Sequence, residues 1–141
     1  MFNHDSTTIS IIISAIALIL SIFSFWQSRA STVRDFFMHG DSPEMKKNRK
    51  VIYDIYNQQK DDSDMLDKLN EKSAEVSSVV SFYDFWALMV RKHYLPKWTF
   101  QASSRYTALN IYDKVEPYIK FRRKEQPKYA NHFEWLRNKI R

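Results

Sequence analysis

The side chains of this chain that could do chemistry are the cationic and aromatic residues of its C-terminal part. Residues 91–141 carry 13 basic and 4 acidic side chains, a net charge of +9, whereas residues 41–90 carry 7 basic and 10 acidic ones, a net charge of −3. Lys and Arg contact phosphates, and aromatic rings offer surfaces on which nucleobases stack. We therefore predict a site for an anionic nucleotide here. The residues that we expect to form it are Arg91, Lys92, Tyr94, Trp98, Arg105, Arg122 and Arg123.

Two alternatives to a nucleotide site remain open for the basic residues. They can face anionic lipid headgroups at a membrane surface, or they can pair with the acidic part of the chain. Contact with headgroups is favoured for a separate basic group that follows the N-terminal apolar segment closely. This group consists of Lys46, Lys47, Arg49 and Lys50.

Catalytic and metal-binding patterns are missing from the sequence. His4, His39, His93 and His132 share no metal-ligand spacing, and the chain has one Gly and no Cys. The serines lack the context of a nucleophile elbow, and there is no phosphate-binding glycine loop. An acidic stretch over residues 61–75 lacks the spacing and the glycine of a calcium loop. We expect a protein that is not an enzyme and that has no catalytic residue, metal or cofactor.

A membrane helix must position these residues. Ile9 to Trp26 is an apolar run of 18 residues interrupted only by serines, without charge, Pro or Gly. As a helix it would measure roughly 27 Å, close to the ~30 Å hydrocarbon core of a bilayer. We predict an external tail over 1–8, a transmembrane helix over 9–28, a juxtamembrane extension over 29–40 and a helical cytosolic domain over 41–141. A cleaved signal peptide is the alternative, although the segment before the apolar run has no basic residue.

Charge predicts the orientation of this helix. All 22 Lys and Arg residues follow the apolar run, whereas Asp5 precedes it. Because basic flanks stay cytoplasmic, we expect the N-terminus outside and the C-terminal domain in the cytoplasm. The expected location is a bacterial inner membrane, crossed once.

Small residues follow one face of the apolar run with alternating spacings of four and three. Such a stripe lets helix backbones approach, and its period of 3.5 favours left-handed packing of parallel copies. We therefore expect a homo-oligomer whose subunit number is open, with a tetramer as one option. Serines that bond back to their own backbone are the alternative. The residues of this serine seam are Ser10, Ser14, Ala17, Ser21, Ser24 and Ser28.

The remaining sequence has helical periodicity throughout, so the fold class that we predict is all-α. Asp41 or Ser42 can cap a helix that begins near Pro43 and ends before a polar turn over 57–64. A short acidic helix, a long apolar helix over 71–93 and a helix over 97–124 should follow. We expect the last of these to be kinked or broken near Pro117, and a final helix to follow Pro127. About five helices result, including the extension of the first.

Three segments carry a resemblance to known proteins: Val79–Phe85, Pro117–Arg123 and His132–Leu136. Their pattern resembles a family of small bacterial proteins of unknown function with an N-terminal membrane helix and a helical tail. The overall plan is also similar to the small membrane effectors of type III CRISPR systems. That similarity implies a cytosolic domain that binds cyclic tetra-adenylate and a membrane segment that acts on the bilayer in antiviral defence.

The resulting prediction is a membrane-anchored sensor or effector whose basic domain binds a cyclic oligonucleotide, at an interface between subunits. Its expected partners are membrane lipid, further copies of the chain and this ligand, and DNA is not among them. The alternative is a non-enzymatic scaffold that binds another inner-membrane protein and no small ligand.

Overall fold

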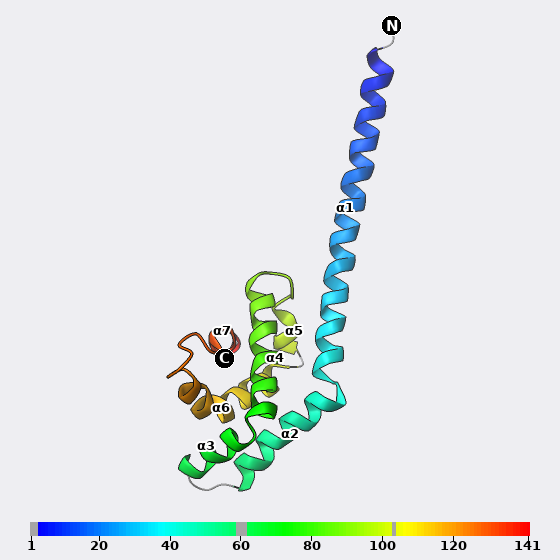
Figure 1. Ribbon diagram of the computed structural model, residues 1–141. Helices are drawn as coiled ribbons and strands as arrows, with labels where there is room; N and C mark the ends of the chain where they lie inside the picture. The colour runs from blue at the N-terminus through cyan, green and yellow to red at the C-terminus, as the bar shows by residue number, and fades with distance from the viewer. Residues whose placement is uncertain (1–2, 59–61, 103) are drawn as a thin grey trace.

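The computed structural model describes residues 3–58, 62–102 and 104–141, and these residues form helices without a strand. The all-α prediction is therefore confirmed. One long helix leads into a compact group of shorter ones (Figure 1). The helices are α1 (Asn3–Gly40), α2 (Pro43–Gln58), α3 (Asp62–Glu71), α4 (Ser73–Arg91), α5 (Trp98–Ala102), α6 (Arg105–Arg122) and α7 (Asn131–Ile140).

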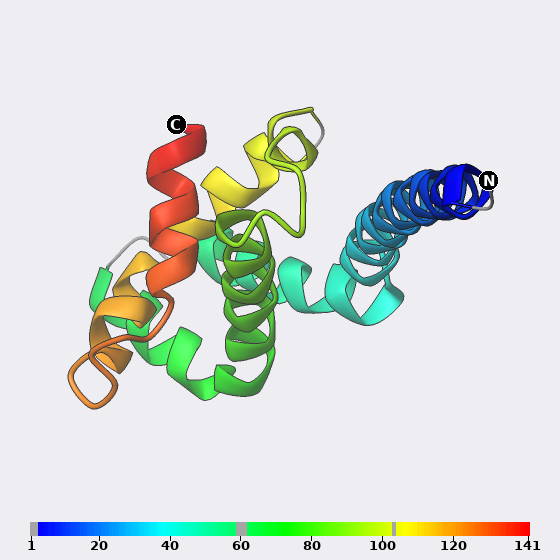
Figure 2. The same cartoon turned by 90° about the horizontal axis from the view of Figure 1, so that it is seen from above.

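Most of α1 stands apart from the other helices (Figures 1 and 2). Among the described residues it is the one helix that is long and apolar enough to cross a membrane. Its large apolar side chains from Ile9 to Trp26 are all exposed, an arrangement that is rare in soluble monomers. The helix begins at Asn3, within the predicted tail, and it continues to Gly40 as predicted.

The last turns of α1 belong to the core of the domain. Phe36 is only 3% exposed, and its ring lies 5.9 Å from Phe82, 5.4 Å from Trp86 and 4.8 Å from Phe100. These rings come from α4 and α5, so one aromatic cluster joins three helices. Ring pairs at such distances contribute about 0.5–1.5 kcal/mol each beyond the apolar area that they bury.

The turn between α1 and α2 leaves little room for a side chain. A Cβ atom added at Gly40 would lie 3.2 Å from Cζ of Phe82, so the close approach of α1 to α4 explains this glycine. Its φ angle is not in the left-handed region, unlike that of a usual glycine helix stop. Ser42 then caps α2, because its Oγ accepts a hydrogen bond from the Met45 N–H at 3.2 Å.

The helix that we predicted over 97–124 is divided differently in the structure. Two helices, α5 and α6, replace it, and the division lies near Ser104, the N-cap residue of α6. We predicted a kink or a break near Pro117, and the break was wrong, since α6 passes through this residue. Val115 and Tyr118 are fully buried on either side of Pro117, so packing offsets the hydrogen bond that the proline lacks.

The long helix predicted over 71–93 is α4, and it ends at Arg91, before Pro96 is reached. His93 has a φ angle of 64°, and its N–H donates to the carbonyl of Val90 at 3.0 Å. The N–H of Tyr94 donates to the carbonyl of Met89 at 2.9 Å. These two bonds form a Schellman motif in which His93 occupies the position that glycine usually takes.

A residue of α4 caps the start of α7. The N–H groups of His132 and Phe133 donate to Oδ1 of Asp84 at 2.8 and 2.9 Å. The N-cap residue of α7 is Ala130, whose side chain has no acceptor, so the carboxylate of Asp84 takes over that function from 48 residues away. The Tyr83 and Phe133 rings stack beside this contact at 4.9 Å.

We predict that Asp84→Ala lowers the free energy of unfolding by about 2 kcal/mol, because two N–H groups at the start of α7 lose a charged acceptor. Asp84→Asn retains an acceptor oxygen and should cost about 0.5 kcal/mol, because only the attraction between the negative charge and the helix dipole is lost. Urea unfolding of the full chain in detergent, followed by tryptophan fluorescence, measures both. Asp113→Ala, which removes an exposed carboxylate that pairs with Arg137, is the matched control. Equal losses for Asp84→Ala and this control would contradict the capping role.

Candidate functional site

A cavity of about 410 Å³ lies where α1 meets the domain. Its size falls within the range of about 300–1,000 Å³ that is usual for small-molecule sites. The end of α1, the following turn, α2, α4 and the start of α6 all contribute to it. We call it the joint cavity, and it is lined by Phe36, Phe37, Gly40, Asp41, Arg49, Tyr53, Phe82, Tyr83, Ser104 and Thr107.

Arg49 is the cationic residue among those that line the joint cavity. Its Nη2 donates to the carbonyl of Gly40 at 2.8 Å, which holds the half-buried guanidinium against the end of α1. A guanidinium has five N–H donors, so this bond leaves donors for a ligand. Asp41 also borders the cavity, but its exposed carboxylate faces Lys46 at 3.8 Å. Arg49 therefore gives the cavity a fixed positive charge.

Two tyrosines beside Arg49 remain neutral hydrogen-bonding groups. Burial raises the pKa of Tyr83, and the charge of Arg49 offsets part of that rise. Burial raises the pKa of Tyr53 in the same way, again opposed by Arg49. A raised tyrosine pKa disfavours the phenolate, so both hydroxyls stay protonated at neutral pH and can donate to an anion.

The beginning of α6 adds polar groups on another side of the joint cavity. Ser104 is the N-cap residue, and Thr107 lies in the first turn of this 18-residue helix. This turn contains no acidic residue, so no carboxylate from α6 offsets the positive end of the helix dipole. Together with Arg49, the hydroxyls and the helix end suit a small anion. The rings of Phe36 and Phe82 suit an apolar or aromatic portion of the same ligand.

The structure separates the predicted ligand residues into groups. Arg91, Lys92, Tyr94 and Trp98 lie at the end of α4 and the start of α5, and all four are exposed. Arg122 and Arg123 lie at the end of α6, on the opposite side of the domain (Figures 1 and 2). One small ligand cannot contact both groups within a single chain. A site built from all seven residues would need more than one copy.

Several of these residues already have partners within the domain. Arg123 donates to the carbonyl of Tyr129 and to Oε2 of Glu134, both at 2.9 Å, and so ties α6 to α7. Arg105 donates to the backbone carbonyl oxygen of Arg141 at 2.7 Å. Arg122 lies over the ring of Tyr129. The structural contacts of Arg123 make it a poor choice for testing a ligand site by charge reversal.

Arg91 is also engaged, because its guanidinium lies over the ring of Trp135 at 5.8 Å. Lys92, Tyr94 and Trp98 are the predicted ligand residues that project most freely. Trp98 borders a second cavity, next to α1.

The residues of the serine seam are all exposed on α1. The hydroxyls of Ser14 and Ser21 donate to the carbonyls of Ser10 and Ala17 at 2.9 and 2.8 Å. In the single chain these two hydroxyls therefore donate to the backbone of their own helix, as the alternative to self-association predicts. Their oxygen lone pairs remain available to a donor from another helix.

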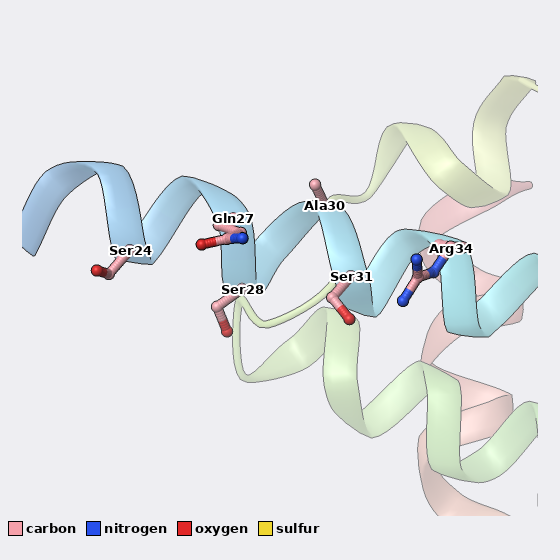
Figure 3. A pocket seen from close by; sticks show the side chains of 6 residues that line it. All are labelled: Ser24, Gln27, Ser28, Ala30, Ser31 and Arg34. Carbon is pink, nitrogen blue, oxygen red and sulfur yellow. The ribbon is translucent and has the colours of Figure 1, made fainter.

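The same face of α1 continues beyond the predicted seam. Ser24, Ser28 and Ser31 project from one side of α1 (Figure 3). They border a shallow depression of about 620 Å³ that is also lined by Gln27, Ala30 and Arg34. One helix cannot enclose a ligand, so we regard this depression as a surface that a second helix could cover. The alternating spacing of four and three residues, extended from Ser28 by three residues, would have included Ser31.

Sequence reasoning missed the joint cavity. It grouped Arg49 with Lys46, Lys47 and Lys50 as a face toward lipid, and only the three lysines are fully exposed. The contact of Arg49 with Gly40 depends on the angle between α1 and α2, which no residue pattern encodes. The hydroxyls of Ser104 and Thr107 reach the cavity from the start of a helix that begins 56 residues after Arg49.

One protein family matches nearly the full length of this chain. No curated protein matches it, and no solved structure does. Residues 11–140 match the model of a family that is described as Domain of unknown function (DUF4760). This match extends from the apolar part of α1 to the end of α7, and the chain therefore belongs to the DUF4760 family.

Proposed function

We propose that this protein is a membrane-anchored sensor whose domain binds a small anionic ligand in the joint cavity. The observation that supports this proposal best is that the cavity is shared between α1 and the domain. Phe36, Phe37 and Gly40 come from α1, whereas Arg49 and Tyr83 come from α2 and α4. A ligand in this place contacts both parts at once.

Such a ligand would act on the angle between the membrane helix and the domain. Ligands shift a conformational equilibrium by the difference in their affinity for its states. Because Arg49 binds the last carbonyl of α1, a ligand that draws the guanidinium inward competes with this contact. The signal would then pass to α1 through its buried end.

The ligand class that we propose is a phosphorylated nucleotide. Arg49 and the start of α6 suit a phosphate, and the aromatic wall of the cavity suits a base. A cyclic oligonucleotide that meets the predicted residues Arg91, Lys92 and Arg122 would bind between copies of the chain, as the sequence predicts. The role in antiviral defence that the similarity to CRISPR membrane effectors implies remains a prediction.

We predict that Arg49→Gln weakens binding of a nucleotide monophosphate to the full chain in nanodiscs at least tenfold, because a charge-assisted contact contributes about 1.5–3 kcal/mol. Thr107→Val, which removes one hydroxyl at nearly constant volume, should weaken binding less. Isothermal titration with adenosine monophosphate, cyclic tetra-adenylate and inorganic phosphate provides the measurement. Lys50→Gln is the matched control, since Lys50 is exposed and pairs with Asp54 outside the cavity.

Two outcomes would contradict the assignment. Binding that is unchanged by Arg49→Gln but is lost in Lys92→Gln would move the site to the predicted basic residues. Absence of saturable binding for all three compounds would favour the alternative function, a scaffold that binds another membrane protein and no small ligand.

The orientation that we propose places the N-terminus outside a bacterial inner membrane and the domain in the cytoplasm. The support is that all Lys and Arg residues follow the apolar run. The chain has no Cys, so single cysteines at Thr8 and Lys120 report on the two sides. We expect a membrane-impermeant maleimide to label Thr8→Cys in intact spheroplasts, and Lys120→Cys only after lysis. The reverse pattern would refute this topology.

We also propose that α1 associates with parallel copies of itself through the serine seam. Small side chains allow close backbone approach, and the stripe continues through Ser31. The combined change Ser14→Leu, Ala17→Leu and Ser21→Leu should reduce the oligomer mass that light scattering finds in detergent. The matched control is Ile12→Leu, Ile16→Leu and Ile19→Leu on the rest of the helix surface. A mass that both variants leave unchanged would exclude the seam as the interface.

A further inference from the structure

The loop between α4 and α5 lies beside α1, at the level where the apolar run of α1 ends. A cavity of about 430 Å³ separates the two segments. Trp26, the last residue of the apolar run, borders this cavity together with Pro96 and Trp98. The remaining lining residues are Arg29, Ala30 and Val33, which continue α1 toward the domain.

If α1 crosses a bilayer, this level is the headgroup layer. The hydrocarbon core is about 30 Å thick and the headgroups add roughly 5–8 Å on each side, or about four to five helical residues. The apolar run ends at Trp26, so the headgroup layer begins there and includes Arg29 and Ala30. The α4–α5 loop is therefore held at headgroup depth while the rest of the domain extends away from the membrane (Figure 1).

The exposed side chains of this region have the composition of a membrane interface. Trp26 is 70% exposed, Tyr94 62% and Trp98 53%. Trp and Tyr are enriched where membranes meet water, because their rings are apolar and carry one polar group. Lys92 and Lys97 in the same loop are also exposed. Each basic residue near an anionic membrane surface adds about 1 kcal/mol of attraction.

Arg29 adds a donor that has no partner within the described part of the chain. Its Nε is buried and has no hydrogen-bond partner among the described residues, while its guanidinium lies over Phe25 at 5.8 Å. Because this Nε is covered by protein atoms, a lipid phosphate would bind the other N–H groups of the guanidinium, which has five N–H donors in all. Arg29 lines the cavity, so its charge is placed to attract such a phosphate.

We infer that the α4–α5 loop docks on the membrane that α1 crosses, and that the cavity between Trp26 and Trp98 accepts an anionic phospholipid headgroup. Arg29, Lys92 and Lys97 attract the phosphate. Trp26 and Trp98 contact the apolar part of the lipid next to the phosphate. The Schellman motif at His93 holds the loop in the conformation that presents Tyr94. This inference rests on the proposed membrane anchor and goes beyond the proposed ligand site, because it concerns lipid and residues that do not line the joint cavity.

The test uses the full chain in nanodiscs of phosphatidylcholine alone or mixed with phosphatidylglycerol. A single Tyr94→Cys change reports on the loop, and Glu125→Cys reports on the end of the domain beyond α6. We expect a neutral, water-soluble maleimide to react several-fold more slowly with Tyr94→Cys when phosphatidylglycerol is present, and equally with Glu125→Cys in both lipids. The rates at Tyr94→Cys give the ratio of loops docked on the membrane to undocked loops. Lys92→Gln or Lys97→Gln should each lower this ratio about fivefold. Lys120→Gln and Lys124→Gln are the matched controls.

Two results would overturn the inference. The first is a reaction rate at Tyr94→Cys that does not depend on lipid composition. The second is protection that appears only with two or more chains per disc, which would assign the loop to contact with a second copy. Neither result depends on binding of a nucleotide at Arg49, so the proposed function and this inference can fail separately.

Discussion

The structure depends on the burial of Phe36 among aromatic rings of the domain. A membrane helix that is joined to a soluble domain by a flexible linker can move without affecting it. Here the same rigid element is exposed along its apolar run and buried at its end, where Phe36 is 3% exposed. Truncation of a buried phenylalanine typically costs about 3–5 kcal/mol, a large fraction of the stability of a small domain. The direction of α1 is thus fixed by the same packing that stabilises the fold.

The three segments on which we predicted a family resemblance hold three helices together. Asp84 caps α7, Tyr83 stacks on Phe133, and Arg123 pairs with Glu134 at 2.9 Å. These contacts join α4, α6 and α7, and each spans segments that are distant in sequence. The fold therefore accounts for these side chains, and they give no information about a ligand.

Sequence reasoning predicted the features that local periodicity determines. The fold class, the end of α1 at Gly40 and the cap at Ser42 follow from hydrophobic spacing and capping chemistry. It failed where tertiary contacts outweigh local rules. Pro117 continues a helix because Val115 and Tyr118 are buried on either side of it. Net charge indicated an abundance of basic residues in the last third of the chain but could not show that those residues are spread over opposite sides of the domain.

The single glycine of the chain lies where the long helix α1 meets the domain. Gly40 allows α1 to approach Phe82 closely at this contact. The 38 residues of α1 extend roughly 57 Å from there, at 1.5 Å per residue. A rotation of α1 by about 5° at this contact would move the far end of the helix by about 5 Å. Phe36 is buried four residues before Gly40, so the same rotation displaces its ring far less than it displaces the far end of the helix.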